Sequence, residues 1–426
     1  MIEIKDKKDC CGCGACMQRC PKKCISLEED NEGFLYAKAD ASLCINCGLC
    51  DKVCPLLNPK EKIQPKEVLA VKSRNEEERL KSSSGGVFIA LAREIIAKGG
   101  VVFGAVFDKN WEVHHVCAER IEDVYPMMGS KYVQSRIEDT FKEAESFLKQ
   151  GREVLFTGSP CQIAGLRSFL RFKDYPNLLA VDFLCHGVPS PGVWRQYLAE
   201  TYSGWKPAKD KKSRLQAAAG KNTVLLSLNK KSPIGGISFR DKSTGWKKYR
   251  FVVRGKSASK ADQNSVLSSD IHYDNVYMRG FLSDIYLRPS CYECRCKNGA
   301  NHSDLTIADY WGARVTDKDF DDDKGLGLVM VNTDKGKSYF DSLDMDVRKI
   351  TLEKAHLCNG GFNEHTKPHP NRDKFFRMVD SGMDVSSAVE KCLHVSPLRR
   401  LALKVEGAAR RFLRKCIKES SKRVFY

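Results

Sequence analysis

The sequence predicts a small α+β head rich in cysteine, a larger α/β domain with a mostly parallel sheet, and a helical basic C-terminal tail. Three observations lead to this fold class. Eight of the 19 cysteines form two matching runs within the first 55 residues, helix and strand patterns alternate between residues 87 and 184, and positive charge accumulates after residue 395. At 426 residues the chain exceeds one ordinary core, so we expect more than one domain.

The two cysteine runs share one spacing: two residues separate the first three cysteines, three residues precede the fourth, and proline follows. In bacterial ferredoxins with two 4Fe-4S clusters, three cysteines of such a run bind one cluster and the fourth binds the other. The spacing therefore predicts a ferredoxin-like head with two clusters. The expected ligands are Cys10, Cys13, Cys16 and Cys54 at the first site, and Cys44, Cys47, Cys50 and Cys20 at the second.

A pair of zinc knuckles is the alternative, because C-x2-C is also a zinc spacing. Zinc takes four ligands, whereas two runs that each end in Cys-Pro fit the cluster pattern without remainder. Cys11 and Cys24 are left over. We interpret Cys11 as a spectator thiol beside its ligating neighbour, with exchange for Cys10 as the second interpretation.

The composition indicates a globular protein of the cytoplasm. No run of eighteen apolar residues occurs, and the N-terminus lacks the apolar stretch of a signal peptide. Because the cytoplasm keeps thiols reduced, 19 cysteines favour metal binding over disulfides. The formal net charge is +17, but residues 396–426 alone hold ten Lys or Arg against two Glu. No nucleic-acid fold signature accompanies this charge, so we expect no nucleic-acid partner.

Beyond a polar linker at residues 57–67, the pattern indicates βαβ units. The expected elements are a Ser/Gly loop at 82–86 that opens a helix within 82–100 capped near Gly99, further helices at 139–151 and 161–171, and strands at 101–107, 153–157 and 177–184. Sites in such sheets lie beyond the carboxyl ends of the strands. Cys161 and Cys185 each follow a strand, so they should reach the same crevice.

The expected domains follow from these patterns. They are the head at 1–62, the larger domain at 63–345 with an inserted flap at 203–275, a helical extension at 346–395, and a basic amphipathic helix at 396–426. Such a helix either docks on its own protein or makes peripheral contact with the inner surface of the membrane. Short strands are expected in the flap at 223–228 and 237–241.

Several stretches of the larger domain resemble the family of beta subunits of coenzyme F420 hydrogenases and dehydrogenases. They are SSSGGVF, GSKYVQS, LFTGSPCQIAGL, VDFLCHGVPSP, FRDKSTGW, LRPSCYECRCK, SDLTIADYWG and VNTDKG. The chain is also similar to 7-hydroxymethyl chlorophyll a reductase, which shares this catalytic domain. The resemblance covers roughly two-thirds of the chain and does not extend to the basic C-terminus.

The resemblance implies that the larger domain is a flavin domain that binds FAD and holds a further 4Fe-4S cluster. It makes the Ser/Gly loop a candidate for the FAD pyrophosphate, although a plain helix N-cap would have the same sequence. The loop candidates are Ser82, Ser83, Ser84, Gly85 and Gly86. The candidates around the flavin ring are Lys131, Tyr132, Gln134, Thr157 and Gly158.

For this third cluster we expect Cys161, Cys185, Cys291 and Cys294 as ligands, and Cys296 could replace Cys294. The first two converge by the strand argument, and Cys291 and Cys294 supply a C-x2-C pair. A competing hypothesis makes Cys161 a nucleophile, because the start of a helix would lower the pKa of its thiol.

Together these features predict an enzyme, a ferredoxin-linked flavin oxidoreductase. Clusters would relay single electrons to or from FAD, which would exchange a hydride with a deazaflavin coenzyme or a similar small molecule. The expected electron partner is a ferredoxin or another redox subunit. Two alternatives stay open, an electron-transfer subunit without its own substrate and a ferredoxin-dependent reductase of another metabolite. The sequence identifies no catalytic residue.

Overall fold

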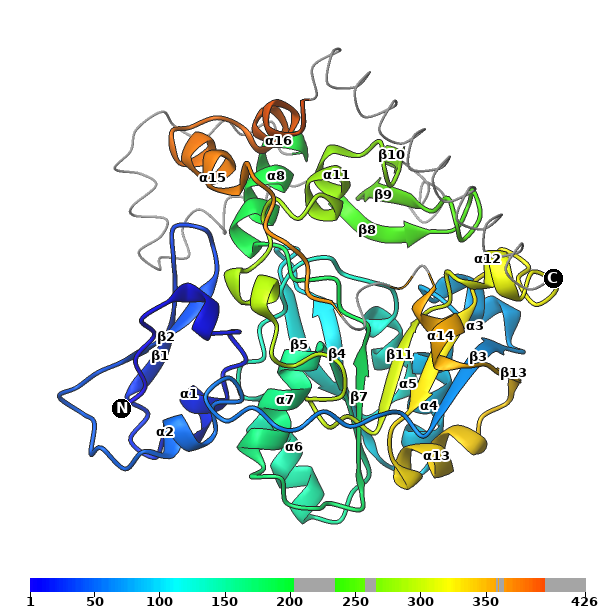
Figure 1. Ribbon diagram of the computed structural model, residues 1–426, viewed down its shortest axis with the longest axis horizontal. Coiled ribbons are helices and arrows are strands. Elements are labelled where there is room, and N and C mark those ends of the chain that lie inside the picture. The colour runs from blue at the N-terminus through cyan, green and yellow to red at the C-terminus, as the bar shows by residue number, and fades with distance from the viewer. Residues whose placement is uncertain (203–233, 257–265, 358, 360–363, 395–426) are drawn as a thin grey trace, which may run out of the picture.

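The computed structural model describes residues 1–202, 234–256, 266–357, 359 and 364–394. In this part of the chain an eight-stranded sheet forms the centre, with strand order β13-β3-β12-β11-β7-β6-β4-β5 (Figure 1). The strands are β3 (Glu67–Ser73), β4 (Val101–Phe107), β5 (Val113–Ala118), β6 (Val154–Gly158), β7 (Leu178–Phe183), β11 (Leu305–Asp309), β12 (Gly327–Val331) and β13 (Met345–Lys349).

The sheet is mixed, so the prediction of a mostly parallel sheet was wrong outside its centre. β4, β6, β7 and β11 pair in parallel, whereas β5, β12, β3 and β13 pair with their neighbours antiparallel. Only residues 108–112 join β4 to β5, and so short a connection allows only an antiparallel return. The other edge is formed by β12, β3 and β13, which lie outside residues 87–184. The alternating pattern of helices and strands in those residues predicted only the parallel centre of the sheet.

Helices cover both faces of the sheet, and the two-residue period of β4 separates the layers. Val102 packs in the core cluster of α4, whereas Phe103 packs in the cluster of α6 and α7. The helices next to the sheet are α3 (Glu76–Lys81), α4 (Val87–Ala97), α5 (Ile121–Val124), α6 (Thr140–Lys149), α7 (Pro160–Phe169), α12 (Ala313–Thr316), α13 (Asp334–Asp341) and α14 (Leu352–His356). A 3-10 helix, η2 (Tyr125–Met127), follows α5.

A second layer lies beyond one end of the central strands (Figure 1). It holds a three-stranded antiparallel sheet in the order β10-β9-β8 and several helices that share a core with buried Trp194, Phe251 and Tyr277. Its elements are α8 (Pro191–Tyr202), β8 (Ile234–Asp241), β9 (Arg250–Gly255), β10 (Val266–Ile271), α11 (Val276–Leu282), η4 (Pro289–Glu293), α15 (Arg372–Asp380) and α16 (Val385–Leu393).

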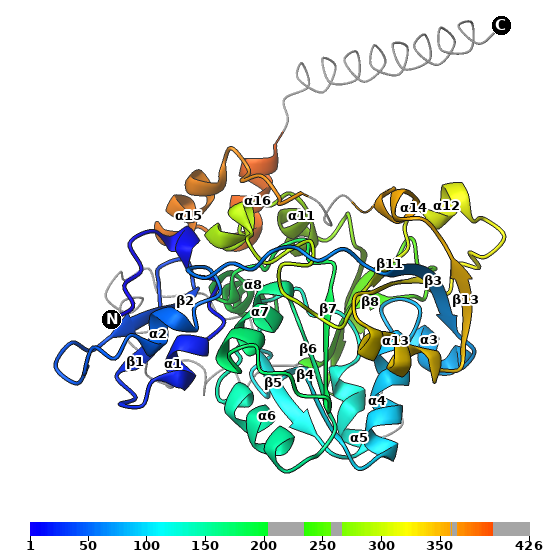
Figure 2. The same cartoon turned by 60° about the horizontal axis from the view of Figure 1, so that its bottom comes forward.

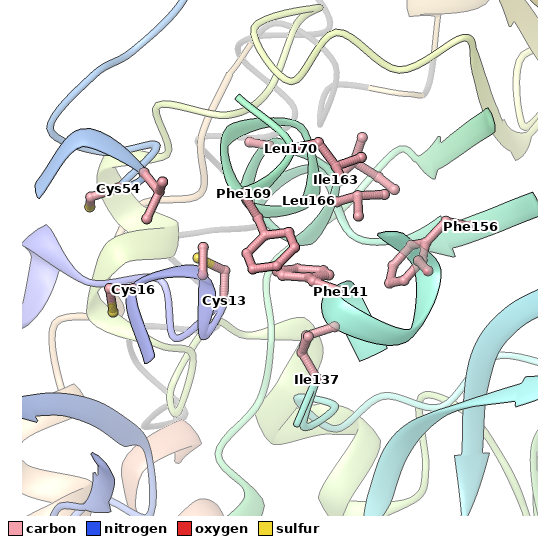
Figure 3. Packing of buried hydrophobic residues seen from close by; sticks show 14 of the residues in the cluster. Cys13, Cys16, Cys54, Ile137, Phe141, Phe156, Ile163, Leu166, Phe169 and Leu170 are labelled. Carbon is pink, nitrogen blue, oxygen red and sulfur yellow. The ribbon is translucent and has the colours of Figure 1, made fainter. Parts of the chain in front are cut away.

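The head is a small α+β unit beside the central sheet (Figure 2). Its elements are η1 (Lys7–Asp9), α1 (Ala15–Arg19), β1 (Ile25–Glu29), β2 (Leu35–Ala39) and α2 (Leu49–Lys52). The head shares one buried cluster with α6 and α7, and Figure 3 shows Cys13 next to the rings of Phe141 and Phe169. The head cysteines are thus packed against the large domain.

The predicted helices and strands between residues 87 and 184 are confirmed, each within a few residues. The strand expected at 237–241 lies within β8, whereas the strand expected at 223–228 and the basic helix at 396–426 lie outside the described residues. β13 crosses the expected domain boundary after residue 345 and belongs to the central sheet. None of the described helices combines the length and apolar character needed to cross a membrane.

Candidate metal centres and cofactor site

Each predicted set of four head cysteines lines a cavity of its own. The cavity of the first set measures about 340 Å³, and Cys11 and apolar Leu27 also line it. The cavity of the second set measures about 360 Å³ and is also lined by Cys24. Cys20 lies with the second run and Cys54 with the first, as the exchange of fourth cysteines between the runs requires.

Glycine allows the loops of the two runs to turn inward. Gly14 and Gly48 stand just before α1 and α2 and have φ values of 72° and 69°. A side chain would be strained in this left-handed region, whereas glycine adopts it readily. Both runs therefore build the same local structure, a cysteine loop that leads into a short helix.

A third cavity of about 400 Å³ lies between the head and the large domain. Its cysteines come from the head, the start of α7, the loop after β7, and the segment that includes η4. They are Cys11, Cys161, Cys185, Cys291, Cys294 and Cys296. All four cysteines expected at a third cluster are thus brought together, and the choice between Cys294 and Cys296 stays open because both line the cavity.

Several buried thiols around these cavities favour their protonated form. Burial raises the pKa of both Cys16 and Cys291 to about 12. A hydrogen bond with Cys11, together with burial, raises the pKa of the Cys161 thiol well above its usual range. This opposes the hypothesis that Cys161 is a nucleophile activated by the start of α7. Metal binding needs thiolates, so it would release protons from these sites.

The cysteine sets fit iron–sulfur clusters by the chemistry of their donors. Each cavity presents at least four sulfur ligands, and cluster binding in proteins uses four cysteine thiolates. Over the described ranges, no group of three or more His, Cys, Asp or Glu side chains is arranged to hold a single metal ion.

Cys11 connects the first and third cavities, because it lines both. Its thiol is hydrogen-bonded to Cys13 of the head and to Cys161 of α7. Gly165 of α7 allows Cys13 of the head to pack closely against this helix. A methyl group at Gly165 would lie 2.8 Å from Cys13 Cβ and 3.0 Å from its Sγ. The lining of the second cavity includes the exposed Cys47.

Two of the predicted FAD segments lie next to each other. Ser83 Oγ and Ser130 Oγ are 2.8 Å apart, which joins the Ser/Gly loop to the segment of Lys131 and Tyr132. In the described structure the main-chain N–H groups of residues 83–86 have no protein acceptor. These free donors precede α4, a helix of 11 residues, and therefore fit a phosphate group.

A buried ion pair holds this region together. The Arg240 guanidinium donates to both carboxylate oxygens of Asp309 at 2.9 and 3.0 Å, to Ser83 O at 3.2 Å and to Tyr132 Oη at 3.3 Å. The sequence patterns did not single out Arg240 or Asp309 as site residues. Their place in the FRDKSTGW and SDLTIADYWG motifs was the available signal.

The remaining flavin candidates point to different surroundings. Lys131 Nζ donates to the carbonyl oxygens of residues 127, 128 and 129, and burial lowers its pKa to about 7. Thr157 accepts a hydrogen bond from buried His115 through its carbonyl oxygen, next to Gly158. Gln134 instead faces the head, where it donates to Cys11 O and accepts from Arg288.

Comparison with known families accounts for both parts of the chain. Residues 151–356 match the family described as the C terminus of the coenzyme F420 hydrogenase/dehydrogenase beta subunit, and residues 9–57 match the 4Fe-4S dicluster domain. Residues 151–356 therefore form a domain of this beta-subunit family. The resemblance inferred from the motifs is confirmed, and the head is a 4Fe-4S dicluster domain. Five of the six cysteines around the third cavity lie within the beta-subunit match, and Cys11 comes from the dicluster head.

Two relatives are longer than the regions over which they match this chain. The F(420)H(2) dehydrogenase of Methanosarcina mazei has an F subunit that is 28% identical over 197 residues, which cover 43% of this chain and 55% of the relative. The coenzyme F420-dependent sulfite reductase of Methanocaldococcus jannaschii is 28% identical over 173 residues, 40% of this chain and 26% of the relative. The chain thus spans about half of one relative and about a quarter of the other.

Among solved structures, a chain of the F420-reducing NiFe hydrogenase complex from Methanosarcina barkeri is similar. The sequence identity is 16% and the TM-score 0.43, over 78% of this chain and 92% of that chain.

Proposed function

We propose that this protein is an iron–sulfur flavoprotein oxidoreductase with three 4Fe-4S clusters and FAD. Cys10, Cys13, Cys16 and Cys54 would hold the first cluster, and Cys20, Cys44, Cys47 and Cys50 the second. Cys161, Cys185, Cys291 and Cys294 would hold the third, with Cys296 as the alternative to Cys294. When bound, such clusters exchange single electrons and FAD exchanges one or two.

The observation that carries this proposal is the series of three cysteine-lined cavities. The second cavity includes exposed Cys47, and the first and third share Cys11. This order favours entry or exit of electrons at the second site and exchange with the large domain at the third. The chain contributes the spacing, the apolar surroundings of the sulfurs, and the tight packing of Cys13 on Gly165.

The proposed FAD site lies at the Ser82–Gly86 loop and at Lys131, Tyr132, Thr157 and Gly158. The free N–H groups before α4 would bind the pyrophosphate. Arg240 would position the loop and Tyr132 through its hydrogen bonds to both. Gln134 is a weaker candidate, because both ends of its amide are already hydrogen-bonded at the head.

The proposed reaction moves electrons between a redox partner and a small acceptor. A ferredoxin or another subunit would meet the head, and a deazaflavin coenzyme or a similar molecule would exchange a hydride at the flavin. One relative is a subunit of an F(420)H(2) dehydrogenase and the other is a coenzyme F420-dependent sulfite reductase, which favours this acceptor. The second candidate is an electron-transfer subunit without its own substrate, which the name of the dehydrogenase relative also favours. A ferredoxin-dependent reductase of another metabolite is the third.

Cys161→Ala in anaerobically prepared protein tests the ligand assignment. Iron should fall from about twelve to about eight atoms per chain, because one four-iron cluster is lost. Cys117→Ala is the control, since Cys117 is exposed and lines none of the three cavities. Unchanged iron in Cys161→Ala would remove Cys161 from the ligand set and return the nucleophile hypothesis.

The acceptor is tested by adding a deazaflavin to the purified chain reduced with dithionite. Reduction of the deazaflavin by the chain alone supports the enzyme proposal. Activity that appears only with a co-purifying subunit supports the electron-transfer role.

We also propose the domain boundaries expected from the sequence and a role for the basic segment at residues 396–426. Deleting residues 396–426 should lower co-sedimentation with anionic liposomes if this segment contacts membranes peripherally. Equal co-sedimentation of both proteins would exclude that contact.

A further inference from the structure

Arg288 is a fully buried cationic side chain between the head and the large domain, with 0% exposure. Its Nε donates to Cys10 O at 2.8 Å, its Nη2 to Leu35 O at 2.8 Å, and its Nη1 to Gln134 Oε1 at 3.0 Å. Its guanidinium also lies over the ring of Tyr36, 4.4 Å from the ring centre. All three hydrogen-bond acceptors are neutral, so they orient the cation without compensating its charge.

No carboxylate in the described part of the chain forms an ion pair with Arg288. The other buried Arg residues of the described ranges differ, since each has a carboxylate partner: Arg79 pairs with Asp322, Arg167 with Asp304, Arg240 with Asp309, and Arg372 with Glu32. Burying a charge away from water is costly unless an opposite charge accompanies it. Within the described ranges, the negative partner of Arg288 must therefore be a group other than Asp or Glu.

Sulfur atoms are the groups placed to supply this negative charge. Cys10, Cys11 and Cys291 lie close enough to the guanidinium that their sulfurs, as thiolates, would favour its charged form. The backbone carbonyl of Arg288 accepts from the N–H of Cys291, 2.9 Å away. Cys10 lines the first cavity, and Cys291 lines the third. A 4Fe-4S core of charge about +2 with four thiolates has a net charge of about −2.

We propose that Arg288 is the shared internal counter-ion of the first and third iron–sulfur sites, a positioning residue that raises the reduction potential of both. This inference rests on the proposed function, since it needs clusters at these two cavities. A fixed positive charge stabilises the reduced, more negative form of a nearby cluster more than the oxidised form. Among the described residues, no carboxylate pairs with Arg288 to compensate this charge.

The second site should not feel Arg288 to the same extent. The main-chain and side-chain hydrogen bonds of Arg288 reach Cys10, Val188 and Cys291, which line the first or third cavity. None of these residues lines the second cavity. The second cluster is therefore an internal reference within the same molecule.

The test is a redox titration of the full-length iron-loaded protein, followed by electron paramagnetic resonance under anaerobic conditions. Arg288→Met should lower the reduction potentials of two clusters and leave that of the remaining cluster unchanged. Arg288→Lys keeps the charge and should retain most of both potentials. The matched control is Arg372→Met, which removes another buried guanidinium at the head but one already paired with Glu32 at 2.6 Å.

Three unchanged potentials in Arg288→Met would overturn the proposal, as would shifts that Arg372→Met reproduces. If Arg288→Met fails to retain iron, the Arg288→Lys variant distinguishes the two causes. Iron retained by Arg288→Lys supports the role of the positive charge. Loss of iron from both variants shows that hydrogen-bond geometry alone matters and overturns the proposal. Wild-type protein without iron would instead refute the proposed function.

Discussion

Replacing Gly165 by alanine sets helix propensity against packing at the head. Gly165 lies within α7, and alanine in a helix interior is favoured over glycine by about 1 kcal/mol. An alanine methyl group here would lie 2.8 Å from Cys13 Cβ, 3.0 Å from its Sγ and 3.3 Å from Phe141 Cε2. Overpacking of a core costs about 1–3 kcal/mol, so the clash should outweigh the propensity.

We therefore expect Gly165→Ala to be destabilised by up to about 2 kcal/mol and to lose iron from the head. The assay is thermal unfolding of the anaerobic holoprotein, with iron measured per chain. Gly236→Ala is the matched control, because its added methyl group meets nothing closer than Arg254 Cβ at 3.8 Å. A higher unfolding temperature for Gly165→Ala with full iron content would refute the close packing of α7 on Cys13.

Two further predictions concern buried charge. Burial lowers the pKa of His115 to about 4, so the folded state binds fewer protons than the unfolded state between about pH 6.5 and 4, and stability is lost as pH falls through that range. His115→Gln should remove about 1 kcal/mol of the stability lost between pH 7.5 and 5.5 in urea unfolding, because it no longer titrates. Its neighbour His114 has a raised pKa because the Asp108 carboxylate lies 3.5 Å from its Nε2. His114→Gln should therefore make that loss larger, and equal slopes in both variants would contradict this account. Asp309→Asn would leave buried Arg240 without its carboxylate partner. We expect this variant to lose about 3 kcal/mol of unfolding free energy and to bind less FAD per chain. Full flavin content would exclude the proposed positioning role of Arg240.

The cysteine spacing predicted more of the candidate site than any other feature. The same spacing occurs in both runs, and in the ferredoxin pattern the fourth cysteine of each run binds the cluster of the other run. The sequence therefore predicted that Cys20 lies with the second run and Cys54 with the first. The strand argument likewise brought Cys161 and Cys185 to one cavity. These inferences depend on local spacing and on the ends of parallel strands, which a sequence displays directly.

Features that depend on contacts between distant segments could not be predicted. Cys11 looked like a spectator, yet it reaches Cys161 across the domain boundary. Arg288 follows an apolar stretch and gave no sign of its burial against Cys10 O. The antiparallel edge formed by β3 and β13 brings together residues about 270 positions apart in the sequence, and neither strand carries a signal that selects its partner.

The central claim is that cysteine sulfur holds iron at three sites in one chain. Metal analysis of anaerobically purified full-length protein, with flavin extracted from the same sample, tests it most directly. We predict about twelve iron atoms and one FAD per chain, with little zinc. Colourless protein that contains zinc in place of iron would contradict the account.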